Sequence, residues 1–297
     1  MKKRILIVLL ALFAFTSKGF SQFDQPTFQI GVGLAIPLDQ LKGDNYLQTY
    51  VSNGLQITKV DSVDFIVNNY GAKTGFSVFG KAKINFDKFN ILRGVGSIGF
   101  NSFNTFQSSQ SGNYFLRVNG QTVALPASYN YNFNALSIGL GLEVAPTSFT
   151  GVVSPYFGGY LTFNNFTGEI NRTENSYDTT RMSFSGFRIG ANLDAGIEFK
   201  VDPQFGFALG FKYDFGNLLL KEKASGNLSE RYDWGRTNGK LWDDGGLYYG
   251  NIQKSENNPN DVGTYNSNSK NLNWGTVYLA VNFYPNALKK TGSTKKK

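Results

Sequence analysis

The chain has 297 residues, with 29 lysines and arginines against 21 acidic residues, and it contains neither cysteine nor histidine. These absences exclude disulfides, thiol chemistry, catalytic sites that need a histidine base and metal sites built on histidine or cysteine. Nine cations lie in the first 21 residues and in the C-terminal tail, which leaves 20 basic against 21 acidic residues between them. A basic face for nucleic acid is therefore not expected.

The first 21 residues have the form of a secretory signal peptide. Lys2, Lys3 and Arg4 precede an unbroken apolar run at residues 5–15, and Gly19 and Ser21 are small residues placed for cleavage before residue 22. The apolar run is too short for an anchoring helix, which needs ~20 apolar residues. The pattern predicts a signal peptide at 1–21 and export of the remaining chain.

The mature chain contains segments in which apolar and polar residues alternate, the period of a β-strand. The clearest example covers residues 187–201, where every odd position is apolar and the even positions are charged, polar or glycine. Strands of globular proteins are usually ~5–6 residues long, so a segment of this length after a signal peptide indicates a transmembrane barrel strand. In chain order, we predict strands at about 27–36, 74–86, 91–106, 130–145, 155–168, 183–201, 205–215 and 272–284. In the third strand we expect Leu92, Ile98 and Phe100 to face lipid, because the opposite facing would place Arg93 there.

Short and long connections alternate between these segments, as periplasmic turns and extracellular loops do in bacterial outer-membrane barrels. The predicted fold class is therefore all-β: an eight-stranded antiparallel transmembrane β-barrel over residues 22–284, followed by a basic periplasmic tail at 285–297. A ten-stranded barrel stays open, because residues 47–60 and 114–125 each flank an Asn-Gly hairpin signal. We interpret both as hairpins above the membrane, since their faces are too polar for lipid.

The aromatic and glycine content fits this class of protein. The chain has 34 glycines, 27 phenylalanines and 16 tyrosines. We expect glycine and other small residues inside the barrel, phenylalanine on its lipid face, and aromatic belts at the two membrane interfaces.

Three segments carry a resemblance to a known family. They are Phe28-Gln29-Ile30-Gly31-Val32-Gly33-Leu34, Ser154-Pro155-Tyr156-Phe157-Gly158-Gly159 and Val277-Tyr278-Leu279-Ala280-Val281-Asn282-Phe283. In these the chain resembles the outer-membrane β-barrel family that contains PorT-like and "porin family" proteins. The resemblance implies the barrel and a location in the outer membrane of a Gram-negative bacterium. It implies no particular activity.

Charged side chains recur on the faces expected to point inward. They are six cations and four anions: Lys81, Lys83, Arg93, Glu143, Arg188, Asp194, Glu198, Lys200, Lys212 and Asp214. An eight-stranded barrel has room only for side chains, and a buried unpaired charge is costly, so these residues should form ion pairs that plug the barrel. The alternative is a narrow or gated path for ions along the same charges.

The long connection at residues 217–270 is rich in aromatic residues, Asn and Gly. Such loops on a rigid scaffold are typical binding sites, and its candidate binding residues are Tyr232, Trp234, Trp242, Tyr248 and Tyr249. The alternative is that these aromatics pack over the barrel mouth or lie at the lipid headgroups. The adjacent Asp243 and Asp244 are expected to be solvated acidic loop residues.

The predicted function is non-enzymatic: a structural or surface-interaction protein whose extracellular loops contact a ligand or an envelope protein. No catalytic residue, cofactor or metal site is predicted, and the expected partners include outer-membrane lipid but no nucleic acid. A porin-like narrow ion channel and an accessory role in outer-membrane secretion or assembly stay open as alternatives. The sequence does not determine the oligomeric state.

Overall fold

The computed structural model describes residues 26–42, 47–52, 55–60, 70–86, 91–105, 112–118, 121–146, 153–174, 178–222, 241, 243 and 269–285. Side chains are described in all of these ranges except 47–60, 105–131 and 170–182. Within this part of the chain no helix is long and apolar enough to cross a membrane. The predicted signal peptide and most of the predicted basic tail lie outside the described residues.

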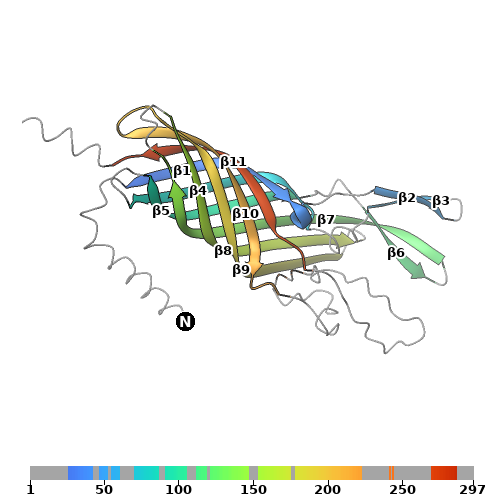
Figure 1. The fold of residues 1–297 in the computed structure, drawn as a ribbon. Coiled ribbons are helices and arrows are strands. Elements are labelled where there is room, and N and C mark those ends of the chain that lie inside the picture. Colours follow the sequence, from blue (N-terminus) through green and yellow to red (C-terminus); the bar gives the residue numbers. More distant parts are fainter. Residues whose placement is uncertain are drawn as a thin grey trace, which may run out of the picture.

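Eight antiparallel strands form a closed barrel (Figure 1). Around the ring the order is β5–β4–β1–β11–β10–β9–β8–β7, and pairing of β7 with β5 closes it. The strands are β1 (Thr27–Leu38), β4 (Ala72–Asn85), β5 (Leu92–Thr105), β7 (Gln121–Val144), β8 (Val153–Glu174), β9 (Asp178–Lys200), β10 (Phe205–Leu219) and β11 (Asn273–Phe283). A single turn of 3-10 helix, η1 (Asp39–Leu41), follows β1. The prediction of eight strands is confirmed, and the ten-stranded alternative is wrong.

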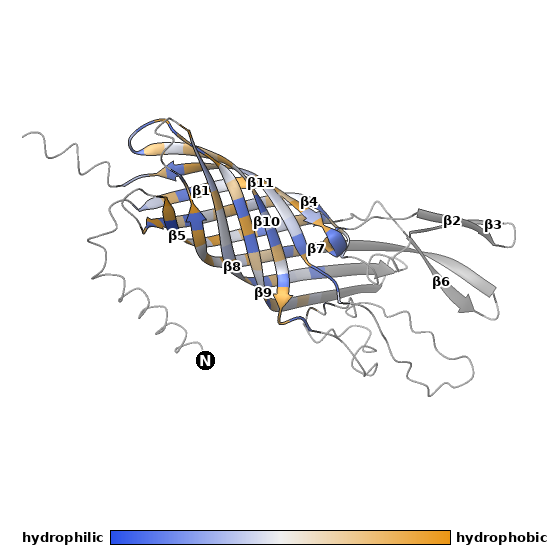
Figure 2. Ribbon diagram, viewed as in Figure 1, coloured by the Kyte–Doolittle hydropathy of each residue, from blue (hydrophilic) through white to orange (hydrophobic). Residues whose placement is uncertain are grey.

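The alternating sequence pattern maps onto the two faces of the barrel wall. In β1, for example, Ile30, Val32 and Leu34 are exposed on the outside, whereas Gln29 is buried inside. Apolar and polar residues accordingly alternate along the coloured parts of the barrel strands (Figure 2). Leu92, Ile98 and Phe100 face outward as predicted. The register of the strands places apolar residues opposite apolar residues. Val32, for example, lies between Leu279 of β11 and Val78 of β4, and the outward apolar residues therefore form one continuous band.

The two ends of the barrel differ in their connections. At the end where β1 begins and β11 ends, strands are joined by short connections, such as residues 201–204 between β9 and β10. We call this the turn end. Connections at the opposite end include residues 39–71 and 220–272. We call this the loop end.

At the loop end, strand pairing continues beyond the closed ring. Both predicted hairpins form: β2 (Leu47–Ser52) pairs with β3 (Leu55–Val60), and β6 (Gly112–Val118) pairs with β7 from Val118↔Gln121 onward. The second hairpin differs from the prediction in that its second arm is part of barrel strand β7. Because β7, β8 and β9 run past their barrel partners, they continue beyond the ring as a three-stranded sheet, and the β6–β7 hairpin continues from the outer part of β7. We call these segments together the extension (Figure 1).

The expectation that phenylalanines face lipid is only partly right. Many do, including Phe76, Phe157 and Phe207. Five others are buried inside the barrel, namely Phe79, Phe103, Phe133, Phe166 and Phe184. Aromatic rings suit a closed interior as well as lipid, so the residue's place in the alternation, and not its type, determines its direction.

Candidate functional site

Four charged side chains close the interior at the turn end. Lys83 Nζ lies 3.0 Å from Glu143 Oε1 and 2.7 Å from Glu198 Oε1. Arg93 Nη1 lies 3.0 Å from Glu143 Oε1 and 2.9 Å from Glu198 Oε2. All four residues are buried and come from four strands, β4, β5, β7 and β9. This turn-end cluster has two cations and two anions, so its charges balance.

Lys81 and Asp194 form an ion pair further along the interior. The other carboxylate oxygen of Asp194 accepts a hydrogen bond of 2.6 Å from the Tyr278 hydroxyl, which is itself hydrogen-bonded to the Tyr156 hydroxyl. Lys81 Nζ also lies 5.2 Å from the centroid of the Tyr278 ring, a cation–π distance. These contacts join strands β4, β8, β9 and β11 across the barrel.

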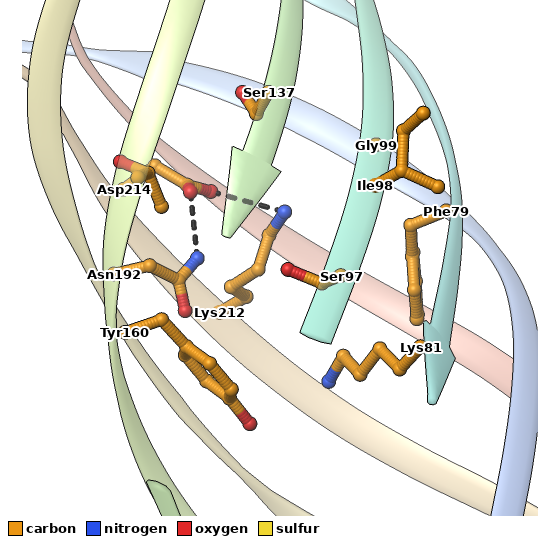
Figure 3. A pocket seen from close by; sticks show the side chains of 11 residues that line it. Phe79, Lys81, Ser97, Ile98, Gly99, Ser137, Tyr160, Asn192, Lys212 and Asp214 are labelled. Atoms are coloured by element: carbon orange, nitrogen blue, oxygen red, sulfur yellow. Dashed lines mark hydrogen bonds and ion pairs between the residues drawn. The ribbon is translucent and has the colours of Figure 1, made fainter. Parts of the chain in front are cut away.

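Lys212 and Asp214 line a small cavity near the middle of the barrel (Figure 3). Lys212 Nζ lies 3.2 Å from Asp214 Oδ2, and the Asn192 amide donates a 2.6 Å hydrogen bond to Asp214 Oδ1. Lys81, Ser137, Tyr160 and Thr162 line the same space, whose volume is about 20 Å³. A cavity of this size has room for about one water molecule.

A cluster of aromatic and aliphatic residues fills the interior at the loop end. Phe133 is at its centre, with ring centroids 5.9 Å from Tyr70, 6.2 Å from Phe103, 5.7 Å from Phe166 and 5.9 Å from Phe184. Trp274 packs edge-on against Phe103 and Phe166. The buried members of this loop-end cluster are Ala35, Leu41, Tyr70, Ala72, Phe103, Phe133, Ala135, Phe166, Phe184, Leu241, Leu272 and Trp274.

Arg188 lies at the same end and pairs with Asp243, a residue of the long β10–β11 connection. Arg188 Nη2 is 2.7 Å and Nε is 2.8 Å from Asp243 Oδ2, and both residues are fully buried. The expectation that Asp243 is a solvated loop residue is therefore wrong. The cause is Arg188, whose buried charge requires a partner that the strands do not supply.

The structure thus places nine of the ten predicted charged residues inside the barrel, each beside a charge of opposite sign. Lys200 is apart from them. It is exposed at the end of β9, where its Nζ lies 5.1 Å from the centroid of the Tyr284 ring. The candidate binding residues Tyr232, Trp234, Trp242, Tyr248 and Tyr249 lie outside the described residues.

Sequence reasoning missed the three tyrosines of the interior, Tyr156, Tyr160 and Tyr278. They are buried, and the Tyr160 hydroxyl donates a 3.3 Å hydrogen bond to Glu143. The signal was present, because all three occupy inward positions of alternating segments. Glycines face their rings: a Cβ atom built on Gly210 would lie 2.5 Å from Tyr278 Cζ. Small residues on neighbouring strands therefore make room for large rings.

The chemistry available to this interior is limited by its pairing. Glu143, Glu198, Asp194 and Asp214 each bind a lysine or arginine, so none is left as a free base in the described part of the barrel. In the same residues no three carboxylates gather where a metal ion could bind. The ion pairs offset the cost of burying these charges inside the barrel.

Comparisons with known proteins agree with the barrel. The family model described as "Outer membrane protein beta-barrel domain" matches residues 7–238. The chain belongs to this family. It is an outer-membrane β-barrel protein, and its lipid environment follows from that. The narrower PorT-like resemblance stays a prediction.

Solved structures with some likeness to this barrel protein include Neisserial surface protein A, with 12% identity, a TM-score of 0.41 and coverage of 87% of this chain and 96% of that chain. The attachment invasion locus protein Ail of Yersinia pestis has 12% identity, a TM-score of 0.37 and coverage of 88% and 98%. A major outer membrane protein of Thermus thermophilus has 10% identity, a TM-score of 0.43 and coverage of 87% and 99%. No curated protein sequence matches the barrel protein.

Proposed function

We propose that this outer-membrane barrel is a non-enzymatic surface-interaction protein with a closed interior, and that its loop end faces the cell exterior and contacts an extracellular ligand or an envelope partner. The observation that carries the proposal is a contrast within one molecule. Side chains fill the interior from the turn-end cluster to the loop-end cluster, whereas strand pairing continues past the loop end into the extension.

The ion pairs argue against the channel alternative. A conducting path needs charges that are open to passing ions, and each buried lysine or arginine on the described barrel strands has a carboxylate within 3.2 Å. The aromatic rings of the loop-end cluster add an apolar layer across the same path. Moving an ion past both would require breaking buried pairs and hydrating an apolar layer, each of which is costly.

The extension supports the surface role because it presents β-sheet outside the barrel. Its strand β6 is paired to β7 on one side, and the β2–β3 hairpin lies next to it. Surface segments held by a rigid scaffold are where proteins place binding residues.

Planar-bilayer recording of the refolded mature protein tests the closed interior. We expect a folded barrel without steady conductance at high salt and at both polarities. A steady conductance whose ion selectivity changes with Lys81→Glu would overturn the closed-barrel proposal and favour the narrow channel.

The surface role is tested by binding of vesicles carrying the protein to glycan and peptide arrays. Two shortened variants are compared with the wild type, one with a Gly-Ser linker in place of residues 224–239 and one in place of residues 246–266. Both keep Leu241 and Asp243, because removing Asp243 would leave Arg188 buried without its partner. We expect binding to be lost in at least one variant whose barrel is folded. Binding that survives in both would contradict a role for this connection.

A further inference from the structure

Each of the three nitrogens of the Arg188 guanidinium has an acceptor at the barrel mouth. Its Nη1 donates to the Phe187 carbonyl at 2.8 Å, its Nη2 donates to the Leu241 carbonyl at 2.7 Å, and its Nε donates to Asp243 Oδ2. Two of these three acceptors belong to the β10–β11 connection and not to the barrel wall. The connection therefore returns to the mouth at residues 241–243.

The carboxylate of Asp243 is surrounded by donors. Besides Arg188, the Asn217 amide donates to Oδ1 at 2.7 Å and the Glu222 backbone N–H donates to Oδ2 at 2.7 Å. The backbone of Asp243 is held as well: its N–H donates to the Glu222 carbonyl at 2.8 Å, and its carbonyl accepts from the Lys270 N–H at 2.7 Å. The hydrogen bonds that end on the Asp243 carboxylate are charge-assisted, and such bonds are among the strong hydrogen bonds of proteins.

Leu241 occupies an apolar position beside this carboxylate. It is fully buried in the loop-end cluster, and its N–H donates to the Ser185 carbonyl at 2.9 Å. Gly186 makes room for it, since a Cβ atom built on Gly186 would lie 2.8 Å from Leu241 Cβ. Leu241 and Asp243 are two residues apart in the sequence, and the mouth thus holds the first in an apolar position and the second among hydrogen-bond donors.

The charges on the barrel strands explain why Arg188 needs a partner from outside the strands. The buried charged side chains described on the barrel strands are five cations and four anions: Lys81, Lys83, Arg93, Arg188 and Lys212 against Glu143, Asp194, Glu198 and Asp214. Among them, the cation without a strand partner is Arg188. An unpaired buried charge is strongly destabilising, so a carboxylate must come from outside the strands.

We propose that the barrel mouth contains a carboxylate-binding site, made by Arg188, Asn217 and the Glu222 N–H, whose ligand is the chain's own Asp243 with Leu241 seated beside it. The bound segment anchors the middle of the β10–β11 connection. Leu241 and Asp243 thereby tie the β10–β11 connection to the barrel mouth at a point between its two ends.

A disulfide between positions 186 and 241 tests the docked position directly. The wild-type chain contains no cysteine, so Gly186→Cys with Leu241→Cys introduces the only two thiols. Disulfides join Cβ atoms that are ~3.5–4.5 Å apart, which a small backbone adjustment from the present spacing allows. We expect the folded barrel to form this bond on mild oxidation, as seen by mass spectrometry of tryptic peptides. The matched control, Gly186→Cys with Leu247→Cys, should form it far more slowly.

Asp243→Asn tests the role of the charge. In the two-cysteine background it should slow disulfide formation by at least about ten-fold, because hydrogen bonds to charged groups contribute ~1.5–3 kcal/mol and each ~1.4 kcal/mol is a factor of ten. Asp244→Asn, the same change one residue later, should leave the rate unchanged. In the cysteine-free protein, trypsin should cut after Lys240 faster in Asp243→Asn than in wild type or Asp244→Asn.

Three results would overturn the proposal: no bond between positions 186 and 241 in a folded barrel, equal bond formation in the Leu247 control, or equal rates in Asp243→Asn and Asp244→Asn. If the cysteine pair prevents folding, the trypsin comparison decides alone. None of these measurements requires an extracellular ligand, so they stand or fall independently of the proposed surface role.

Discussion

The two ends of the barrel interior are closed by different chemistry. The turn-end cluster consists of four charged residues that all belong to strands, Lys83, Arg93, Glu143 and Glu198. The loop-end cluster is mainly aromatic and includes residues of the connections, such as Leu41, Tyr70 and Leu241. The first closure is therefore a property of the barrel wall alone, whereas the second links the barrel to its loops. A change in the long connections is therefore expected to reach the interior at the loop end.

The largest effect is expected from breaking the turn-end cluster. Glu198→Gln keeps the shape of the side chain but leaves Lys83 and Arg93 with Glu143 as their one anion. Removing one partner of a buried ion pair costs about 3–5 kcal/mol, so the free energy of unfolding should fall by that order. Reversible urea unfolding in lipid vesicles measures it.

The charge-balanced double variant, Glu198→Gln with Arg93→Gln, separates charge from packing. It should recover part of the loss, because the remaining Lys83 and Glu143 are again one cation and one anion. Lys200→Gln, at an exposed position of the same strand, should leave stability unchanged. If the double variant is less stable than Glu198→Gln, the cluster is held by packing and not by charge balance.

At the loop end the corresponding change is Phe133→Ala. Phe133 contacts four other rings, and truncating a buried phenylalanine costs about 3–5 kcal/mol. We expect the lower part of that range, because the mouth is built partly from connections that can close over the cavity. Unlike Glu198→Gln, this variant should also speed trypsin cleavage after Lys240, since Leu241 packs in the same cluster.

Phe157→Ala, on the outward face of β8, is the matched control for the measurement of trypsin cleavage after Lys240. It should leave the cleavage rate at the wild-type value. Equal acceleration in Phe133→Ala, Phe157→Ala and Glu198→Gln would mean that the loop end is not specifically linked to the connection, and the comparison between the two ends would fail.

The same contrast explains what the sequence could predict. The eight strands, their facing and the inward charges follow from a period of two, which lipid on one side and a narrow interior on the other impose on every strand. The turn-end cluster is made of such residues, so its members were predictable even though their pairings were not. The partner of Arg188 was not predictable, because Asp243 lies 55 residues away in a connection without periodicity. The extension was predicted only as a hairpin, since lipid no longer imposes alternation on strands outside the membrane.

The smallest effect is expected between the two ends, where neither charge balance nor the connections are disturbed. Gly210 faces Tyr278, and a Cβ atom at this position would lie 2.5 Å from both Cζ and the hydroxyl oxygen of that ring. Gly210→Ala must therefore displace Tyr278 and weaken its hydrogen bond to Asp194, which is 2.6 Å long. Overpacking of this kind costs about 1–3 kcal/mol. Gly159→Ala, where the added Cβ would lie 3.9 Å from its nearest neighbour, should cost much less in the same urea unfolding measurement.

The Gly210→Ala variant should also leave trypsin cleavage after Lys240 unchanged. The reason is that Tyr278 is hydrogen-bonded to Asp194, Tyr156 and Lys81, which belong to neither closing cluster. A faster cut there would show that the middle of the barrel transmits strain to its mouth.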